Sequence, residues 1–500
     1  MSAEPVSDVA EADGAVAHRR HLGRGFNWLG GATIIAKVID FSTIVAVLLF
    51  LTKEQVGIGS LIVSIAVIIE AFDGLGTSDA LVQAKTVSRL QLDTLFWFVV
   101  GTAVLVAGVT LVAAPRIEAA YGVTGMAAYF VAAAVKQPLV GAALIPLALM
   151  NRDLQYERIA IVNVAATLAA ALTRLGLAVA GAGAWALVVG YSASGLYILL
   201  GAMVARPFWP GLQFRMAEIR PLLHFGFRAA AANIFEQIFK NVGQLLIGWF
   251  YGAAPLALYR VSFDITMEPA MAVGTLVNRT ALPVFARVVS AKAELAQSLL
   301  WSLRRLAILV APLMAGLMLA AGPLTALIRD GQGNSYAGAA LPLKLLAAAG
   351  LLRVTSQLLT PVLMASGRPG TAARLSAATL LLLTAGITLA GFCFPARTGV
   401  VAVAAVWLGI YPLLLAWGVA YLRRQWDMRL IDLARAFATP LAGIGAVVLL
   451  VEAGRWLVDT WLIGIWLIGP EDPRLQLGIV IAALALTYGG LFRYARQQPA

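Results

Sequence analysis

Apolar residues along this chain gather in runs of about 20, and short polar segments separate the runs. An apolar α-helix of about 20 residues matches the hydrocarbon thickness of a bilayer, whereas a strand of a membrane barrel needs only about ten. The pattern therefore predicts an all-α, polytopic membrane helix bundle with about 14 transmembrane helices. The predicted spans cover residues 26–51, 56–80, 94–115, 125–149, 159–181, 184–205, 223–250, 256–280, 303–322, 339–365, 372–395, 399–422, 437–458 and 475–495.

The composition agrees with a chain that lies in a membrane. Of its 500 residues, 61% are hydrophobic and 12% are charged, whereas soluble domains carry about 25% charged residues. The single cysteine, Cys393, excludes a disulfide within the chain, and three histidines without a cysteine cluster predict no metal site. The dipeptide Gly-Lys of a P-loop never occurs, so no nucleotide cofactor is expected. With no catalytic constellation either, the sequence predicts a transporter and not an enzyme.

The net charge of +12 is spread in a way that bears on topology. Lys and Arg punctuate the apolar runs instead of forming one basic face, so we expect no nucleic-acid partner. Among the Lys and Arg residues outside the predicted spans, 22 lie in loops on the side of the N-terminus and six lie in loops on the other side. Because positive residues stay on the cytoplasmic side, both termini are predicted to be cytoplasmic, and residues 1–22 are predicted to form a disordered cytoplasmic tail.

The chain also shows signs of an internal duplication. The stretch GFNWLGGATIIAKVIDF opens the first predicted span, and GFRAAAANIFEQIFKNVGQ opens the seventh span on the same side of the membrane. Two parallel six-helix lobes, related by an axis along the membrane normal, would follow from such a repeat. The predicted parts are an N-lobe over 23–205, a cytoplasmic linker over 206–222, a C-lobe over 223–422 and an extra helix pair over 437–495.

Several predicted spans carry polar stripes that need an explanation. In NIFEQIFKNVGQ, residues 233–244, Glu236 lies one turn before Lys240, and amide side chains continue the same helix face. A polar stripe on a spanning helix cannot face lipid, because a charge in the bilayer centre is costly; it must face other helices or a hydrated cavity. The amides of this stripe are Asn233, Gln237, Asn241 and Gln244.

Similar charges occur at corresponding places in the two halves, and they allow two interpretations. They are either buried ion pairs that fix the packing of the helices or the lining of a hydrated cavity between two lobes. Repetition in both halves favours the cavity, and an excess of cations over acids on these spans suits an anionic cargo. The predicted cargo-binding cations are Lys37, Lys240 and Arg260. The predicted cavity acids, which are also candidate sites for H⁺ or Na⁺ as a coupling ion, are Asp40, Glu70, Glu236, Asp264 and Glu268.

Over residues 23–425 the chain resembles the Wzx-type polysaccharide transporters, the lipid-linked oligosaccharide flippases of the MOP superfamily. The segments that carry the resemblance are LTKEQVGIGSLIVSIAVIIEAFDGLGTSDALVQ, LALMNRDLQYERIAIVNV, GWFYGAAPLALYRVSFDI, LPVFARVVSAKAELAQSLLWSLRRLAILVAPL and LMASGRPGTAARL. This resemblance implies two lobes around a cationic cavity that moves undecaprenyl-pyrophosphate-linked sugar repeat units across the bacterial inner membrane by alternating access. The implied partners are that polyprenyl-linked oligosaccharide, membrane lipid, and the polymerase and co-polymerase of surface polysaccharide or exopolysaccharide export. The resemblance assigns cavity roles to Lys37, Asp40, Glu70, Lys240, Arg260 and Asp264.

Two other functions stay open at this point. A cation-coupled drug or metabolite exporter of the MATE type would share the fold, and it would use the acids as ion sites in an acidic, aromatic cavity. A membrane polymerase or ligase acting on the same lipid-linked sugars would need a large outer loop, and the longest candidate loops, around 323–338 and 459–474, are short.

Overall fold

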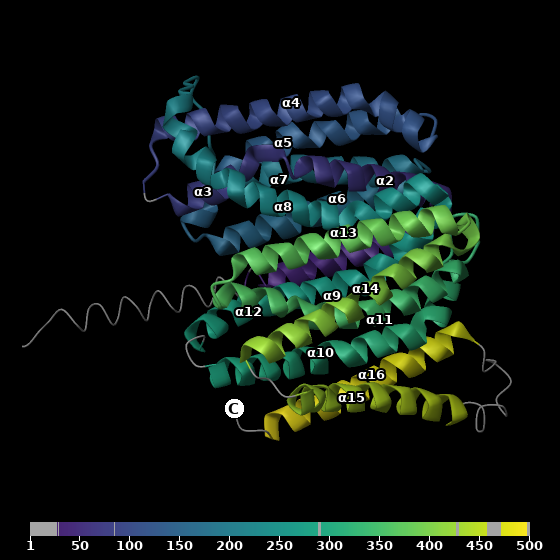
Figure 1. Cartoon of the computed structure of the whole chain (residues 1–500). Helices are drawn as coiled ribbons and strands as arrows, with labels where there is room; N and C mark the ends of the chain where they lie inside the picture. Colours follow the sequence, from purple (N-terminus) through teal and green to yellow (C-terminus); the bar gives the residue numbers. More distant parts are fainter. Residues whose placement is uncertain are drawn as a thin grey trace, which may run out of the picture. The chain divides into compact units, whose positions relative to one another are not determined.

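The computed structural model describes residues 28–497, apart from residues 29, 85, 289–291, 427–429 and 458–471. Regular structure in the described part is helical, with one isolated bridge between Arg329 and Ser335 as the exception. The prediction of an all-α, polytopic membrane bundle is therefore confirmed (Figure 1). Ten described helices are long and apolar enough to cross a membrane, or eleven if one bent pair forms a single span. The predicted number of spans, fourteen, is not confirmed.

The chain divides into two compact units, residues 1–241 and residues 242–500. The boundary falls inside α8, so this helix contributes to both units. The predicted lobe boundaries stay a prediction. Unit 1 contains a helix over Gly30–Leu48, α2 (Lys53–Glu70), η1 (Asp73–Gly76), α3 (Thr77–Gln83), α4 (Arg89–Tyr121), α5 (Met126–Arg152), α6 (Tyr156–Val179), α7 (Ala184–Ala205) and most of α8 (Met216–Tyr251).

In unit 1, α5 packs against α4, α7 and α2, and α6 packs against α7. Small residues permit these close approaches: a Cβ atom added at Gly59 of α2 would lie 2.7 Å from the Leu187 side chain of α7. The helix starts are fixed locally. Thr52 and Gln55 form a capping box at α2, which satisfies two backbone N–H groups at the helix start.

The second predicted span, 56–80, is not one continuous helix. The α-helix α2 ends at Glu70, and the chain then passes through η1 before α3 begins. Three successive residues adopt left-handed backbone angles, with φ of 65° at Gly74, 44° at Leu75 and 72° at Gly76. A Cβ atom at Gly76 would lie 2.1 Å from the carbonyl oxygen of Gly226 in α8, so only glycine fits this contact between two backbones. The span prediction missed this break, because a count of apolar residues takes no account of backbone angles.

Unit 2 contains the end of α8 and nine further described helical segments. They are α9 (Ala253–Val288), α10 (Lys292–Leu327), η2 (Ala337–Ala339), α11 (Ala340–Gln357), α12 (Leu359–Ala365), α13 (Pro369–Cys393), α14 (Ala396–Trp426), α15 (Leu430–Leu457) and α16 (Pro473–Gln497). The α8 and α9 helices have 36 residues each, which exceeds the length needed to cross a bilayer.

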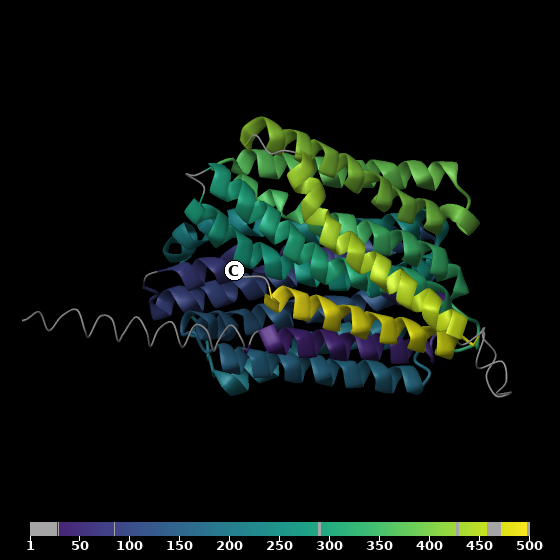
Figure 2. The same ribbon diagram turned by 90° about the horizontal axis from the view of Figure 1, so that it is seen from below.

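The packing of unit 2 centres on α10. This helix contacts α9 and α11 as well as the last two helices of the chain, α15 and α16. Residues Ala320, Val447, Val451, Val480 and Ala483 form a small apolar core among α10, α15 and α16. Figure 2 shows α15 (yellow-green) and α16 (yellow) converging toward one end as a helical hairpin. The α15 and α16 helices thus pack on α10, and the extra transmembrane pair over 437–495 stays a prediction.

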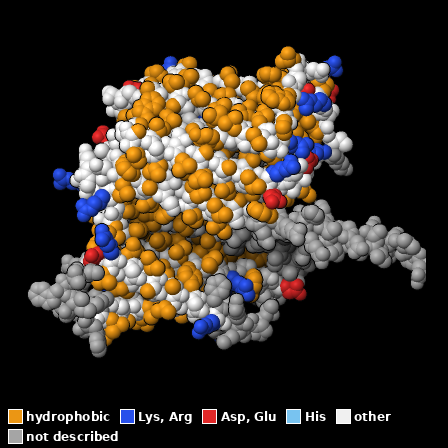
Figure 3. Space-filling view, turned by 180° about the vertical axis from the view of Figure 1, so that it is seen from behind, with side chains coloured by type: hydrophobic (Ala, Val, Ile, Leu, Met, Phe, Trp, Pro, Cys, Tyr) orange, Lys and Arg blue, Asp and Glu red, His pale blue; other side chains and the backbone are white. Residues whose placement is uncertain are grey.

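The surface of the protein agrees with a membrane environment. In Figure 3, hydrophobic side chains cover most of the visible face, and Lys, Arg, Asp and Glu lie toward its margins. Many exposed large side chains belong to the apolar helices, for example Val112 of α4 and Leu389 of α13. A surface of this kind would be unstable in water, and it fits contact with lipid.

Candidate functional site

The polar stripe predicted on α8 forms a chain of contacts along one helix face. The Gln237 side chain donates to Asn233 Oδ1 at 3.4 Å, and Asn241 Nδ2 donates to the carbonyl oxygen of Gln237 at 2.9 Å. Lys240 Nζ lies 2.6 Å from Glu236 Oε1, one helical turn away. The predicted pair therefore exists, and its lysine is half-buried. All these residues belong to unit 1.

A second polar cluster joins α8 and α9 inside unit 2. Arg260 Nε donates to Asp264 Oδ2 at 2.6 Å, and Arg260 Nη1 donates to Gln244 Oε1 at 2.8 Å. The Asp264 side chain is 10% exposed and the Arg260 side chain is 26% exposed. Glu268 lies one further turn along α9 and is half-buried. The predicted residues Gln244, Arg260 and Asp264 thus form one hydrogen-bonded cluster.

The guanidinium of Arg260 has capacity beyond these two contacts. It carries five N–H donors, of which Asp264 and Gln244 take one each. No described residue accepts a hydrogen bond from the other three. Asp264 and Gln244 thus hold the planar group in one orientation, and the remaining donors are able to bind an anion. Guanidinium is well suited to phosphate, because two of its donors reach two oxygens at once.

Glu70 is the centre of a third cluster, which lies in unit 1. Its Oε2 atom accepts from Lys136 Nζ of α5 at 2.8 Å and from the Tyr191 hydroxyl of α7. The Lys136 ammonium also lies 3.7 Å from the centre of the Tyr191 ring. Asp73, at the break between α2 and α3, has both carboxylate oxygens buried, and no described residue donates a hydrogen bond to them. Tyr191 was not a predicted site residue, since a tyrosine on an apolar span gives no sequence signal.

The predicted pair on the first helix is arranged differently from the others. Lys37 is exposed, and Asp40 is half-buried on the helix over Gly30–Leu48. Asp40 Oδ1 lies 3.8 Å from Arg174 Nη1 of α6. Arg174 has room there because Gly190 of α7 has no side chain: a Cβ atom at Gly190 would lie 2.8 Å from the Arg174 Cβ.

Unit 2 holds one more buried cation, which was not among the predicted site residues. Arg353 of α11 donates from Nη1 to the Tyr411 hydroxyl of α14 at 3.0 Å, and its guanidinium lies 5.7 Å from the centre of the Trp407 ring. The rings of Trp407, Phe263 and Tyr259 continue this contact toward α9. Arg353 is 7% exposed, which favours a role in holding α9, α11 and α14 together.

The structure therefore brings the predicted residues together in several small groups. Four of the groups described above combine a basic side chain with an acid, the group around Arg353 contains aromatic side chains instead, and each group lies within one unit. The cavity predicted between the lobes stays a prediction. In the described part of the chain, no three His, Cys, Asp or Glu side chains are placed to hold a metal ion. In a group of this kind the carboxylate orients the basic side chain, and the remaining N–H donors of that side chain are able to bind an anion.

Comparison with known proteins gives three kinds of match. The model of a family described as polysaccharide biosynthesis protein matches residues 47–334. The lipopolysaccharide biosynthesis protein WzxC of Escherichia coli (strain K12) is 24% identical over 356 residues, which are 69% of this chain and 70% of that protein. The inward closed structure of the lipid II flippase MurJ superposes with a TM-score of 0.68 at 11% identity, over 94% of this chain and 99% of that one.

An inward-facing multidrug resistance MATE transporter of the MOP superfamily also matches, with a TM-score of 0.59 at 12% identity. The match covers 79% of this chain and 96% of that one. At such low identity, both structural matches show a shared fold. The fold predicted from the sequence, MATE-like and of the MOP type, is therefore confirmed.

Proposed function

Since the chain belongs to the polysaccharide biosynthesis protein family, as the sequence resemblance predicted, we propose that it is a flippase for lipid-linked sugars. Its cargo would be undecaprenyl-pyrophosphate-linked oligosaccharide repeat units. It would move them by alternating access from the cytoplasmic to the periplasmic leaflet of the bacterial inner membrane, for surface or exopolysaccharide export. Both termini would then be cytoplasmic.

The physics of the cargo supports this proposal. The polyprenyl chain dissolves in hydrocarbon, but the pyrophosphate and the sugars do not, because their transfer out of water without new partners is costly. A protein that moves the cargo must therefore give the head group a polar, cationic path while the tail stays in lipid. Intramembrane cations have that role in other transporters. No bond in the cargo needs to break, so the activity requires no catalytic residue.

The observation that carries the proposal is the placement of Arg260. Its guanidinium lies on α9, two of its donors are fixed by Asp264 and Gln244, and three donors have no acceptor among the described residues. About a quarter of the side chain is accessible. An oriented, partly accessible guanidinium in an apolar helix layer is suited to binding one phosphate of a pyrophosphate head group. Lys240 and Lys37 would supply further positive charge.

The acids extend the same proposal to coupling. Glu236 lies against Lys240, and Asp264 lies against Arg260. If such a carboxylate takes up H⁺ or Na⁺, its attraction for the neighbouring cation falls, and that cation becomes free to bind the cargo. The gradient of one of these ions would then drive transport in one direction.

A MATE-type exporter is the second candidate, and the shared fold supports it. Such a protein would bind cationic or neutral drugs at its acids. The two proposals differ in the sign of the charge that the site recognises. Binding of an anionic head group depends on Arg260 and not on a carboxylate, whereas binding of a cationic drug depends on the carboxylate and not on Arg260.

Complementation tests the proposal directly. The chain is expressed in a strain that lacks its own flippase for a matching repeat unit, and two quantities are measured: surface polysaccharide and the lipid-linked repeat units left accessible on the cytoplasmic leaflet. We expect polysaccharide to return and the cytoplasmic pool to fall. Drug resistance without any change in the lipid-linked pool would instead establish the exporter.

A further inference from the structure

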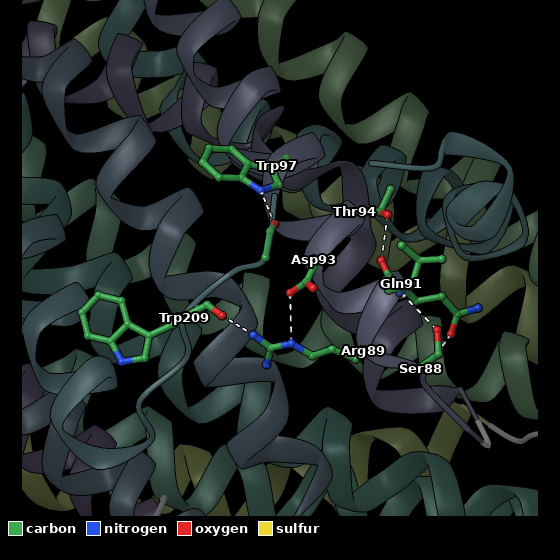
Figure 4. Close-up of polar contacts among 9 residues, drawn as sticks. Ser88, Arg89, Gln91, Asp93, Thr94, Trp97 and Trp209 are labelled. Carbon is green, nitrogen blue, oxygen red and sulfur yellow. Dashed lines mark hydrogen bonds and ion pairs between the residues drawn. The ribbon is translucent and has the colours of Figure 1, made fainter. Parts of the chain in front are cut away.

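The segment between α7 and α8, residues 206–215, is called here the connecting strap. It lies against the first turns of α4 and is held there mainly through its backbone. Arg89 donates to the carbonyl oxygen of Trp209, and Trp97 Nε1 donates to the carbonyl oxygen of Gly211 at 2.9 Å. Figure 4 shows Arg89 between Asp93 and this Trp209 carbonyl group. One side of the strap is therefore fixed to α4.

Further contacts fix which side chains of the strap point inward. Phe208 is 3% exposed and packs in an apolar core with Leu95 and Phe96. Its ring centre lies 5.9 Å from that of Phe96. The strap also ends in a fixed position, because the Arg215 backbone N–H donates to Thr94 Oγ1 at 3.1 Å.

The outward side of the strap is apolar and exposed. The exposed fractions are 78% for Trp209, 92% for Leu212, 56% for Phe214 and 45% for Met216, the first residue of α8. An exposed cluster of large apolar side chains on a rigidly held segment is unfavourable in water and marks an interaction surface. The strap is ten residues long, starts where α7 ends and lies against the first turns of α4. Both of these helices are long and apolar enough to cross a membrane, so this surface lies at the level of the membrane face.

The charges beside this surface are mainly positive. Arg89 pairs with Asp93, and Arg206 pairs with Asp153. Arg215 and Arg220 are exposed, and no described residue binds their side chains. Arg220 lies one helical turn after Met216, so the two share a face of α8. Glu218 lies between Met216 and Arg220 in the sequence and is half-buried; it is the one acid in residues 206–220. The outward face therefore carries a net positive charge.

We infer that the outward face of the connecting strap binds anionic phospholipid at the membrane surface. Trp209, Leu212 and Phe214 enter the boundary between head groups and acyl chains, and Arg215 and Arg220 bind the phosphates of acidic head groups. Tryptophan at the level of the head groups, flanked by arginine, is the composition that membrane interfaces favour. Positive residues next to a span attract acidic lipid within about a Debye length. Because α8 begins where the strap ends, lipid bound here fixes the start of α8 at the membrane face.

Quenching by brominated lipid tests this inference on the full chain. Leu212→Cys is introduced together with Cys393→Ser, and the new cysteine is labelled with a fluorophore. Val112→Cys, on a lipid-facing position of α4 that is 73% exposed, is labelled in the same way as a reference. The protein is placed in bilayers that mix phosphatidylcholine with phosphatidylglycerol, and either one lipid or the other is brominated.

We expect brominated lipid to quench the label at residue 212. Brominated phosphatidylglycerol should quench it several times more strongly than the same fraction of brominated phosphatidylcholine, whereas the label at residue 112 should show little preference. Arg215→Gln and Arg220→Gln should each lower the preference about fivefold. Arg424→Gln, at another exposed arginine near the end of a spanning helix, is the matched control and should leave it unchanged.

Three results would overturn the inference. Quenching by aqueous iodide, with none by brominated lipid, would place the strap in water. Equal quenching by the two brominated lipids would remove the preference for acidic head groups. Protection from both quenchers in native membranes, but not in purified bilayers, would assign the surface to a protein partner. Phe214→Cys provides a second labelling position if the variant at Leu212 does not fold.

Discussion

Replacing Arg260 by Gln should weaken cargo binding by a calculable amount. Arg260 has three donors that no described residue occupies, and one phosphate group would take one or two of them. A hydrogen bond to a charged group contributes about 1.5–3 kcal/mol. Removal of one such contact therefore lowers affinity about tenfold to hundredfold. Arg260→Lys should fall between Arg260→Gln and the wild type, because it keeps the charge but loses the planar fork.

The structure also predicts how to separate binding from stability. Asp264 is 10% exposed, so the loss of Arg260 leaves a nearly buried carboxylate without its cation, which alone costs about 3 kcal/mol or more of folding free energy. The double variant with Arg260→Gln and Asp264→Asn removes both charges and should recover folded protein. It should not recover transport, since the donors for the phosphate are still missing.

The assay combines three measurements on each variant. Immunoblots of washed membranes give the folded, inserted level, surface polysaccharide gives export, and purified protein in nanodiscs gives the affinity for a polyprenyl-pyrophosphate-linked oligosaccharide. Thr379→Ala on α13 is a matched control for the loss of a polar group within a span. Among the described residues, its hydroxyl donates only to the carbonyl oxygen of Leu375 in its own helix. Full export by the double variant would refute the binding role and leave Arg260 as a structural partner of Asp264.

Three further predictions concern unit 1 and the topology. Lys136→Met leaves Glu70 without its cation and should lower the free energy of unfolding in detergent by up to about 3 kcal/mol. Adding Glu70→Gln should restore most of that loss. No loss in the single variant would mean that the pair contributes nothing to stability. Gly226→Ala should lower the unfolding midpoint by the equivalent of about 1–3 kcal/mol because its Cβ would lie 2.8 Å from a backbone oxygen, whereas Gly101→Ala, with nothing within 4 Å, should be neutral or raise the midpoint slightly. In a Cys393→Ser background, single cysteines in three loops should react with a thiol reagent only after the cytoplasmic face is opened, and labelling of intact cells would reverse the predicted orientation. The loops are 84–93, 206–222 and 423–436.

The parts of the site that lie on one helix could be predicted from the sequence. Lys240 and Glu236 are one turn apart, and so are Arg260 and Asp264, and helical geometry alone places each pair in contact. The polar stripe of α8 follows from the same periodicity. The membrane fold was likewise predictable, because the length of the apolar runs reflects bilayer thickness.

Partners on different helices could not be predicted. Glu70 pairs with Lys136 across 66 residues and with Tyr191 across 121, and nothing in an apolar span shows which neighbour it will face. The break after α2 was missed for another reason: it depends on the backbone angles of Gly74 and Gly76 and on a close approach to α8. The position of the connecting strap on α4 could not be predicted either, because its hydrogen bonds to α4 use backbone carbonyl groups, which every sequence has.

The helix pair α15 and α16 provides a position from which the movement of α10 can be measured. The α15 and α16 helices pack mainly on α10, and they interlock with it closely: a Cβ atom at Gly316 of α10 would lie 2.6 Å from the Leu484 side chain of α16. Tyr488 of α16 also donates to the carbonyl oxygen of Leu309. A spectroscopic probe placed on the exposed Ile481 of α16 would therefore follow the displacement of α10 during a transport cycle. Such a probe would record the movement of unit 2 without altering any of the polar side chains that the cargo is proposed to contact.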